Sequence, residues 1–349
     1  MSSRGADAGA ALLLGADGTR ADPSHRGVAE TAPRLRAQRF HAASSPLFSG
    51  RPAGSVTPVT FNDNARVGNN TAKRRGGTVA AVGGGAVGVG GIVVLLISLF
   101  TGTDLTGLLG GGGAPAAPQS GGERVASCET GADANSNDDC RLAAASLNLD
   151  QFWGNTLEGY RAPQLIIVDG STSTTCGTAS NATGPFYCPP DETVYVDPTF
   201  FAILREQYDT TAGPLAQLYV LAHEYGHHVQ NLIGMMDQHP NNGTGPDSNG
   251  VRTELQADCF AGAWVANAGE QVDETGTPYL EPPTDQQITD ALAAAAAVGD
   301  DHIQAESGGA INPESWTHGS SEQRQRWFDT GRQGGVNACD TFSVSGSSL

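Results

Sequence analysis

Two segments of the chain each carry a pair of side chains of metal-ligating type, spaced four residues apart. The segment "LAHEYGHHVQ" contains His223 and His227. The segment "RTELQAD" contains Glu254 and Asp258. Residues four apart lie on the same face of an α-helix. Each pair therefore projects from one helix face, and an ion held by both pairs requires the two helices to pack against each other.

The first pair has the ligand spacing of a zinc-dependent hydrolase. His223 and His227 can bind one ion through their imidazole nitrogens, and the neighbouring Glu224 can act as a general base. Catalytic zinc usually keeps three protein ligands and one open position, and Glu254 can supply the third ligand. Asp258 can then accept a hydrogen bond from the free ring nitrogen of one histidine and fix its tautomer. These residues predict a Zn²⁺ site.

Other interpretations of the same residues stay open. The two histidines can be ordinary hydrogen-bonded polar residues, and Glu254 and Asp258 can lie on a solvated helix face. However, their helix continues with the apolar run "CFAGAWVA", and burying two unpaired carboxylates costs several kcal/mol. A metal removes that cost, and so does an arginine such as Arg252 or Arg324, so a structural ion network is an alternative. His228 points about 100° away from the preceding ligand and is not expected to bind the ion.

The charge distribution divides the chain into two parts. The formal net charge is −18, but residues 1–75 hold 11 Lys and Arg against 5 Asp and Glu, whereas the remainder holds 8 against 32. The acidic part would repel phosphates, which argues against nucleic acid as a partner. The first part has almost no aromatic residues and no sustained apolar period. We therefore predict that residues 1–76 form a disordered, basic, cytoplasmic arm.

Residues 77–100, "GTVAAVGGGAVGVGGIVVLLISLF", contain no charge. In a helix they would span roughly 36 Å, enough for the ~30 Å core of a bilayer. The basic "KRR" just before them predicts a single transmembrane helix, with the N-terminus in the cytoplasm and the body of the chain outside. A Gly-rich flexible linker is the alternative. Residues 101–123 are then expected to form a Gly/Pro/Ala linker, and residues 124–344 the folded domain.

All six cysteines follow the apolar segment. An even number of cysteines on the outer side of the membrane favours disulfides, because that compartment is oxidising. No pair has the two-residue spacing of a zinc knuckle. Local spacing favours two pairs and leaves a third: Cys128–Cys140, Cys176–Cys188 and Cys259–Cys339.

The order of the expected elements indicates an α+β fold, mainly helical with a small sheet. Short apolar runs bounded by turn formers predict strands at 162–170 and 193–197. The last helix begins with a Ser320–Gln323 capping box and is predicted to end at Gly331. Helical spacing of apolar residues, together with start and stop signals, predicts helices at 140–157, 198–210, 212–234, 248–269, 284–300 and 319–331.

Several motifs together resemble the neutral zinc metallopeptidase family of bacteria. They are "FNDNAR", "GPFYCP" with "VYVD", "HEYGHHVQ", "ELQADCFAGAW" and "HGSSEQRQRWFDTG", and the resemblance covers roughly residues 57–342. It implies a zincin-like fold of the type in which glutamate is the third ligand. It implies His223, His227 and Glu254 as zinc ligands. It further implies that Glu224 is catalytic, but it does not imply a particular substrate.

These features lead us to expect a membrane-anchored zinc metallopeptidase that hydrolyses peptides or proteins outside the cytoplasm. Zinc lowers the pKa of a bound water towards about 7, and Glu224 takes its proton as the water attacks the peptide carbonyl. A second donor must stabilise the oxyanion. His318 is the first candidate, with a helix-cap or packing role as its alternative, and Tyr225 and Tyr195 are other candidates. The strand "TVYVD" is a candidate for binding an extended substrate at the sheet edge.

Two other functions are compatible with the sequence. One is a non-enzymatic module that binds zinc, or keeps only an ion network, and recognises partners in the cell envelope. The other is a hydrolase of a non-protein amide, such as one in peptidoglycan. The presence of Glu224 favours an enzyme, because a structural zinc site needs no general base.

Overall fold

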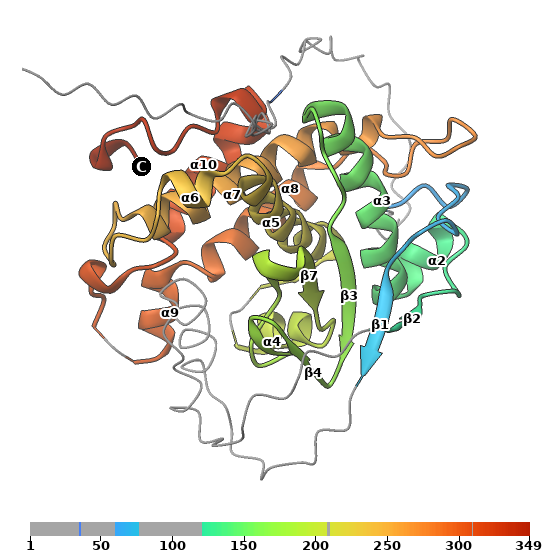
Figure 1. Ribbon diagram of the computed structural model, residues 1–349, viewed down its shortest axis with the longest axis horizontal. Coiled ribbons are helices and arrows are strands. Elements are labelled where there is room, and N and C mark those ends of the chain that lie inside the picture. Colours follow the sequence, from blue (N-terminus) through green and yellow to red (C-terminus); the bar gives the residue numbers. More distant parts are fainter. Residues whose placement is uncertain (1–34, 36–59, 77–120, 208–209, 309) are drawn as a thin grey trace, which may run out of the picture. The chain divides into compact units, whose positions relative to one another are not determined.

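The computed structural model describes residues 35, 60–76, 121–207, 210–308 and 310–349 (Figure 1). These residues form an α+β structure, mainly helical with a small mixed sheet, as predicted. The strand order in the five-stranded sheet is β2-β1-β3-β7-β6, and a separate hairpin pairs β4 with β5. The strands are β1 (Lys73–Gly76), β2 (Glu123–Arg124), β3 (Gln164–Asp169), β4 (Ser171–Thr174), β5 (Gly177–Ser180), β6 (Phe186–Cys188) and β7 (Thr193–Val196).

Six of the α-helices lie at predicted positions, whereas those at Gly131–Ser136, Met235–Gln238 and Asp300–Glu306 were not predicted. The α-helices are α2 (Gly131–Ser136), α3 (Asp138–Thr156), α4 (Phe200–Gln207), α5 (Pro214–Leu232), α6 (Met235–Gln238), α7 (Asn249–Asn267), α8 (Asp285–Ala297), α9 (Asp300–Glu306) and α10 (Ser321–Gly334). Short 3₁₀ turns lie at Pro189–Asp191, Ala268–Glu270, Pro313–Ser315, Val336–Ala338 and Gly346–Ser348.

The sheet is mixed, and its two outer pairings are antiparallel. β1, β3 and β7 run parallel to one another, whereas β2 and β6 run antiparallel to their neighbours. β7, which the sequence analysis considered as a substrate-binding edge, is an inner strand between β3 and β6. That prediction is wrong, because both sides of β7 are already paired. The free edge on this side of the sheet belongs to β6.

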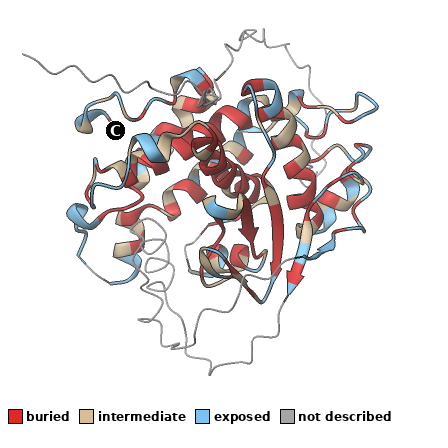
Figure 2. Cartoon of the chain, viewed as in Figure 1, coloured by how far each residue is buried: buried red, intermediate tan, exposed pale blue. Residues whose placement is uncertain are grey.

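Helix α5 runs through the middle of the molecule and is almost entirely buried, as is most of α7 (Figure 2). Glycines allow the helices to approach closely. A Cβ atom at Gly226 of α5 would lie 3.0 Å from the Cα of Ala257 on α7. At Gly262 of α7 it would lie 1.9 Å from the carbonyl oxygen of Phe328 on α10. Side chains at these positions would separate the helices, so the glycines set the spacing on which the site depends.

Gly331 has a different role from the one predicted. The capping box of Ser320 and Gln323 is present, but α10 continues to Gly334 instead of ending at Gly331. A Cβ atom at Gly331 would lie 1.8 Å from the carbonyl oxygen of Cys259 on α7. Gly331 therefore allows α10 to pack closely against α7, and it does not terminate a helix.

Residues 60–76 belong to the folded domain. Phe61, Ala65, Val67 and Ala72 are fully buried, and β1 extends the sheet by pairing with β3. The prediction of a disordered arm up to residue 76 is therefore wrong for this part. The segment is polar at most other positions and lacks a regular period, so its apolar contacts with distant elements could not be recognised from local sequence.

Apart from Leu35, the expected arm before residue 60 falls outside the described residues, as do the transmembrane helix and most of the linker. Among the residues that the structure does describe, no helix is both long and apolar enough to cross a membrane. The pairing of Lys73 with Arg124 nevertheless corrects one part of the predicted orientation. The basic residues 73–75 were expected in the cytoplasm and the domain outside it. Because β1 and β2 lie in one sheet, both must lie on the same side of any membrane.

All three predicted disulfides are present. They join Cys128 to Cys140, Cys176 to Cys188 and Cys259 to Cys339. The last of them ties α7 to the segment that follows α10, and the second ties β6 to the turn between β4 and β5. Helix α7, which carries Cys259, and strand β6, which carries Cys188, both lie beside the site described below.

Candidate metal and catalytic site

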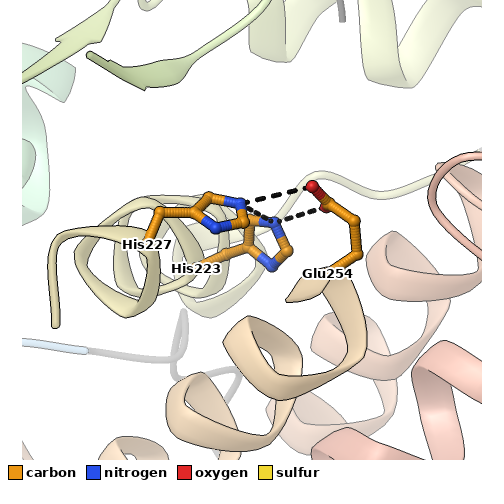
Figure 3. A group of neighbouring side chains, drawn as sticks. All are labelled: His223, His227 and Glu254. Atoms are coloured by element: carbon orange, nitrogen blue, oxygen red, sulfur yellow. Dashed lines mark hydrogen bonds and ion pairs between the residues drawn. The ribbon is translucent and has the colours of Figure 1, made fainter. Parts of the chain in front are cut away.

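His223, His227 and Glu254 bring their ligand atoms together in the buried space between α5 and α7 (Figure 3). Nε2 of His223 lies 3.1 Å from Nε2 of His227 and 3.1 Å from Oε2 of Glu254. Nε2 of His227 lies 3.5 Å from Oε1 of Glu254. These three residues are the ligands predicted from sequence, and their ligand atoms lie together in the structure.

The separations are close to those around a tetrahedral zinc ion, and the two histidines face different oxygens of Glu254. Zinc binds histidine nitrogen and carboxylate oxygen at about 2.0–2.2 Å, so two ligands of a tetrahedron lie about 3.3–3.5 Å apart. The distances among His223, His227 and Glu254 are 3.1–3.5 Å. Two imidazoles and one carboxylate are also a donor set of catalytic zinc sites, which leave a fourth position open. The residues present thus suit Zn²⁺ in both chemistry and geometry.

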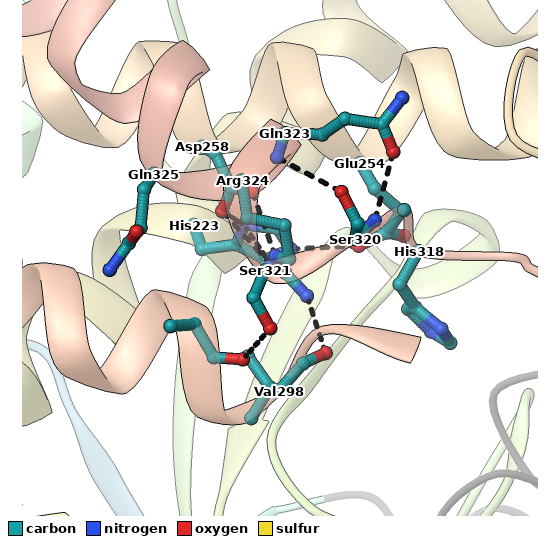
Figure 4. A network of polar contacts seen from close by, with 12 residues as sticks. His223, Glu254, Asp258, Val298, His318, Ser320, Ser321, Gln323, Arg324 and Gln325 are labelled. Carbon is teal, nitrogen blue, oxygen red and sulfur yellow. Dashed lines mark hydrogen bonds and ion pairs between the residues drawn. The ribbon is translucent and has the colours of Figure 1, made fainter. Parts of the chain in front are cut away.

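Asp258 orients the first ligand, as predicted. Its Oδ1 lies 2.8 Å from Nδ1 of His223. The same carboxylate accepts two hydrogen bonds from Arg324 of α10, at 2.8 Å and 2.9 Å, and one from the Tyr219 hydroxyl at 2.5 Å (Figure 4). All four side chains are buried. Arg324 is one of the two arginines that the sequence suggested as partners of these carboxylates. It holds the Asp258 carboxylate, which in turn orients the metal ligand His223.

The second ligand has its own support, which the sequence analysis missed. Nδ1 of His227 lies 2.9 Å from Oε1 of Gln230, one helical turn further along α5. The Gln230 amide donates to the carbonyl oxygen of Thr253 and to Gln256, both on α7. Because an amide oxygen only accepts, Nδ1 of His227 carries the proton and Nε2 is left for the ion. The i, i+3 spacing of His227 and Gln230 was the signal available in the sequence.

The electrostatics of the ligand set follow from burial and from two carboxylates. Burial lowers the pKa of His223, but the Asp258 and Glu254 carboxylates outweigh it and raise this pKa to about 10. Burial raises the pKa of Glu254, yet the neighbouring histidines hold it well below its usual range. The pKa of Asp258 is also lowered, against burial, mainly by Arg324. In the absence of metal, a charged His223 thus compensates the buried carboxylates.

Glu224 lies beside the ligands without being one of them. Its side chain is buried, and burial raises its pKa, while His227 and His223 act in the opposite direction. The backbone of Tyr187, in strand β6, lies close enough to this carboxylate to favour its charged form. The structure thus places the predicted general base between the ligand set and the edge of the sheet.

His318 lies in the loop before α10, close enough to Glu254 for each to shift the pKa of the other (Figure 4). Its Nδ1 lies 3.0 Å from Oδ1 of Asp300. The other Asp300 oxygen accepts backbone N–H groups of Thr317, His318 and Gly319, at 2.7, 2.6 and 3.1 Å. Asp300 therefore fixes both the loop and the ring. No spacing rule connects it with His318, so the sequence analysis missed it.

The remaining candidates lie away from the ligand set. The Tyr225 hydroxyl is directed to Asp150 of α3, and the Tyr195 hydroxyl donates to Asp191 at 3.0 Å. Arg252 donates to backbone carbonyls of the C-terminal segment instead of to Glu254. The expectation that Tyr225 or Tyr195 reaches the reacting carbonyl is therefore wrong, because Tyr225 is fully buried beside Asp150 and the Tyr195 hydroxyl is bonded to Asp191.

Comparisons with known proteins agree with this site. A family model described as "Putative neutral zinc metallopeptidase" matches residues 59–342. An uncharacterized protein of Mycobacterium tuberculosis (strain H37Rv) is 52% identical over 223 residues, which are 63% of this chain and 76% of that protein. The uncharacterized protein YpfJ of Escherichia coli (strain K12) is 38% identical over 275 residues, 74% of this chain and 88% of that protein. No solved structure matches the chain.

The family model spans most of the chain, and its match begins at residue 59, one residue before the described segment 60–76. The match contains all residues of the metal and catalytic site. It confirms the resemblance inferred from the sequence motifs. The chain therefore belongs to the neutral zinc metallopeptidase family.

Proposed function

We propose that this protein is a zinc-dependent peptidase in which Glu224 is the general base. The observation that carries the proposal is the position of Glu224. It is a buried carboxylate beside a complete His223–His227–Glu254 ligand set, and it is not needed to bind the ion. A purely structural zinc site has no use for such a group.

Each residue of the site then has a defined role in the proposed reaction. Zinc bound by the three ligands supplies a Lewis acid and acidifies a water molecule. Glu224 accepts the proton of the attacking water and returns it to the leaving amine. His318, held by Asp300, donates to the carbonyl oxygen as that oxygen becomes negative. Asp258 and Gln230 keep the two imidazole ligands in the required tautomer.

Strand β6 is the proposed binding site for an extended substrate. It is the outer strand of the sheet, and the Tyr187 N–H points to Glu224 instead of to β7. In the antiparallel register Tyr187 lies opposite Val194. Since an outward N–H marks a non-hydrogen-bonded pair, the Tyr187 carbonyl also faces the free edge. A peptide that pairs with this edge would pass directly in front of Glu224.

The proposed location of the protein is the outer face of a membrane. Three disulfides indicate an oxidising compartment for the domain. The apolar residues 77–100 are proposed to attach the chain to the bilayer. Because β1 and β2 flank this segment and pair with each other, the attachment must leave both flanks outside.

The proposal is tested with the full chain, because residues 60–76 are part of the fold. Zinc-loaded protein is incubated with a mixed peptide library, and cleavage is read by mass spectrometry beside the Glu224→Gln variant. Cleavage that falls by several orders of magnitude in the variant, with bound zinc unchanged, supports the peptidase. An absence of cleavage by folded, zinc-bound wild type contradicts it. That result would favour a non-enzymatic envelope module or a hydrolase of peptidoglycan amides.

A further inference from the structure

The third histidine of "HEYGHHVQ" makes contacts that the zinc site does not explain. His228 is fully buried and lies outside the ligand group. Its Nδ1 lies 3.0 Å from the hydroxyl of Tyr187 in β6, and its Nε2 lies 2.7 Å from the carbonyl oxygen of Arg161. Asn231, one turn further along α5, donates to the same Tyr187 hydroxyl at 2.9 Å.

The directions of these hydrogen bonds are fixed by chemistry. The Arg161 carbonyl only accepts, so Nε2 of His228 must carry the proton. In the neutral ring Nδ1 is then an acceptor, and the Tyr187 O–H donates to it. The Asn231 amide donates to the Tyr187 oxygen, which completes a one-way chain from Asn231 to Arg161. Both ring nitrogens of His228 and the Tyr187 hydroxyl therefore have hydrogen-bond partners while His228 stays neutral, as its burial requires.

Tyr187 connects this chain of hydrogen bonds to the catalytic site. Phe186 and Cys188 face the β4–β5 side of the sheet, where Phe186 stacks on Tyr195. Side chains alternate along a strand, so Tyr187 faces α5. Its hydroxyl meets His228, while its backbone N–H meets Glu224, one helical turn earlier on α5. The Tyr187 hydroxyl thus bonds β6 to α5, at the level where the strand's backbone passes Glu224.

We propose that His228 is a positioning residue that fixes strand β6, through the Tyr187 hydroxyl, at the place where the strand meets Glu224 and the substrate backbone. The inference rests on the proposed peptidase function. β6 has only three residues and pairs on one side, so its backbone needs an anchor besides β7. The strand is the element that pairs with substrate, and a displacement of about 1 Å can reduce turnover by about 10²-fold.

The main variant is Tyr187→Phe, which removes the hydroxyl and keeps the ring. Its matched control is Tyr195→Phe, on the neighbouring strand, where the hydroxyl bonds to Asp191 instead of to α5. At the other end of the contact, His228→Leu removes both hydrogen bonds. His228→Asn can keep a side-chain acceptor near the position of Nδ1 and is the conservative rescue. If His228→Leu does not fold, the two tyrosine variants still decide the question.

Two measurements are made on zinc-loaded full-length protein. The first is amide hydrogen exchange of residues 186–188 without substrate, which we expect to be about tenfold faster in Tyr187→Phe than in Tyr195→Phe. The second is peptide cleavage. We expect kcat/KM to fall about 10- to 100-fold in Tyr187→Phe, with an increase in KM and unchanged zinc content. His228→Asn should retain more activity than His228→Leu.

Equal exchange in the two tyrosine variants would overturn the proposal, and so would equal kcat/KM. A loss of activity that parallels a loss of bound zinc would also overturn it, because His228 would then support the ligands and not the strand. The exchange measurement needs no turnover. If wild type cleaves no peptide, the proposed function fails, while the exchange rates still show whether His228 anchors β6.

Discussion

Oδ1 of Asp258 lies 2.8 Å from Nδ1 of His223, and Arg324 holds the same carboxylate from the other side. The contact joins three helices, because His223 lies on α5, Asp258 on α7 and Arg324 on α10. All three side chains are buried. The orientation of a metal ligand therefore depends on the packing of the whole helical layer, and damage to either support should be visible in zinc affinity and in stability.

We expect Asp258→Asn to weaken zinc binding by about 10- to 100-fold, because the hydrogen bond that fixes the His223 ring is lost or inverted. Since the change leaves the buried Arg324 without a carboxylate, we also expect a loss of about 3–5 kcal/mol in the free energy of unfolding. Chelator competition and urea unfolding measure the two effects. Asp329→Asn, which breaks only a partly exposed pair with Arg332, is the control. Equal zinc affinity in both variants would contradict the assigned role.

Zinc binding should release about one proton at pH 6, which lies below the pKa of about 7 that zinc gives to a bound water. In the metal-free protein the pKa of His223 is raised to about 10, so its ring is charged at this pH. The ion binds the neutral ring and must displace the proton from Nε2. Calorimetric titrations in two buffers with different ionisation enthalpies give the number of protons released. A value near zero would mean that His223 is neutral in the metal-free site.

The same pKa predicts how the metal-free protein responds to alkali. A raised pKa means that the charged His223 stabilises the folded state fully below its unfolded pKa of about 6.5. This contribution is lost progressively as the pH rises through about 10. Urea unfolding between pH 6.5 and 10 should show this decline in metal-free protein and a smaller decline in zinc-loaded protein, whose ligands no longer carry the proton. Parallel curves would contradict the assignment.

The ligand set could be predicted from sequence because each half of it depends on helical periodicity within one segment. His223 with His227 and Glu254 with Asp258 are i, i+4 pairs, and the structure shows that each pair faces the site. Asp300 could not be found in this way, because it reaches His318 through tertiary packing of α9 against the loop before α10. Gln230 was accessible in principle, since it follows His227 by one turn.

The longer helices and two of the strands were predictable, but the short elements and the long-range contacts were not. Glycine past a helical run signals a helix end, and Gly331 fits that pattern in sequence. Only the neighbouring helix shows that the position is a crossing point. Residues 60–76 are a similar case, because the strand that they form has its partners, β2 and β3, far along the chain. Local pattern carries no information about such partners.

The helix crossing can be tested by adding one methyl group. We expect Gly262→Ala to destabilise the fold by more than about 3 kcal/mol, because its Cβ would lie 1.9 Å from the carbonyl oxygen of Phe328 and the helices would have to separate. Gly154→Ala in α3 is the matched control, since its Cβ meets nothing closer than 3.9 Å. The control should gain up to about 1 kcal/mol from helix propensity. Similar melting temperatures for the two variants would contradict the close crossing.

The pairing of β1 with β2 predicts that residues on both sides of the apolar segment react alike with a reagent that cannot cross the membrane. Asn69 and Glu158 are exposed positions of the domain, one before the segment and one after it. In intact cells, Asn69→Cys and Glu158→Cys should both be labelled by a membrane-impermeant maleimide, because the disulfides indicate an outer location. Labelling of Glu158→Cys alone would show that residues 60–76 lie on the opposite side, as a single-pass helix requires.

His318 is buried, bonded to Asp300 and close to Glu254, which is compatible with catalysis and with a role in holding the loop before α10. The two roles differ in what a substitution changes. If His318 stabilises the oxyanion, His318→Gln should lower kcat by about 10²- to 10³-fold with little change in KM or bound zinc. If it only holds the loop, the melting temperature should fall while kcat stays the same.

Asp300→Asn separates these roles further. The carboxylate accepts three backbone N–H groups as well as His318, so its loss should loosen the loop in either case. If His318 is catalytic, Asp300→Asn should also lower kcat in protein that is still folded and zinc-bound, because the imidazole ring loses the partner that fixes its direction. If His318 only holds the loop, kcat should not change. Steady-state kinetics below the melting transition of each variant decide between the two. A normal kcat in both His318→Gln and Asp300→Asn would remove His318 from the mechanism and leave the oxyanion to the metal alone.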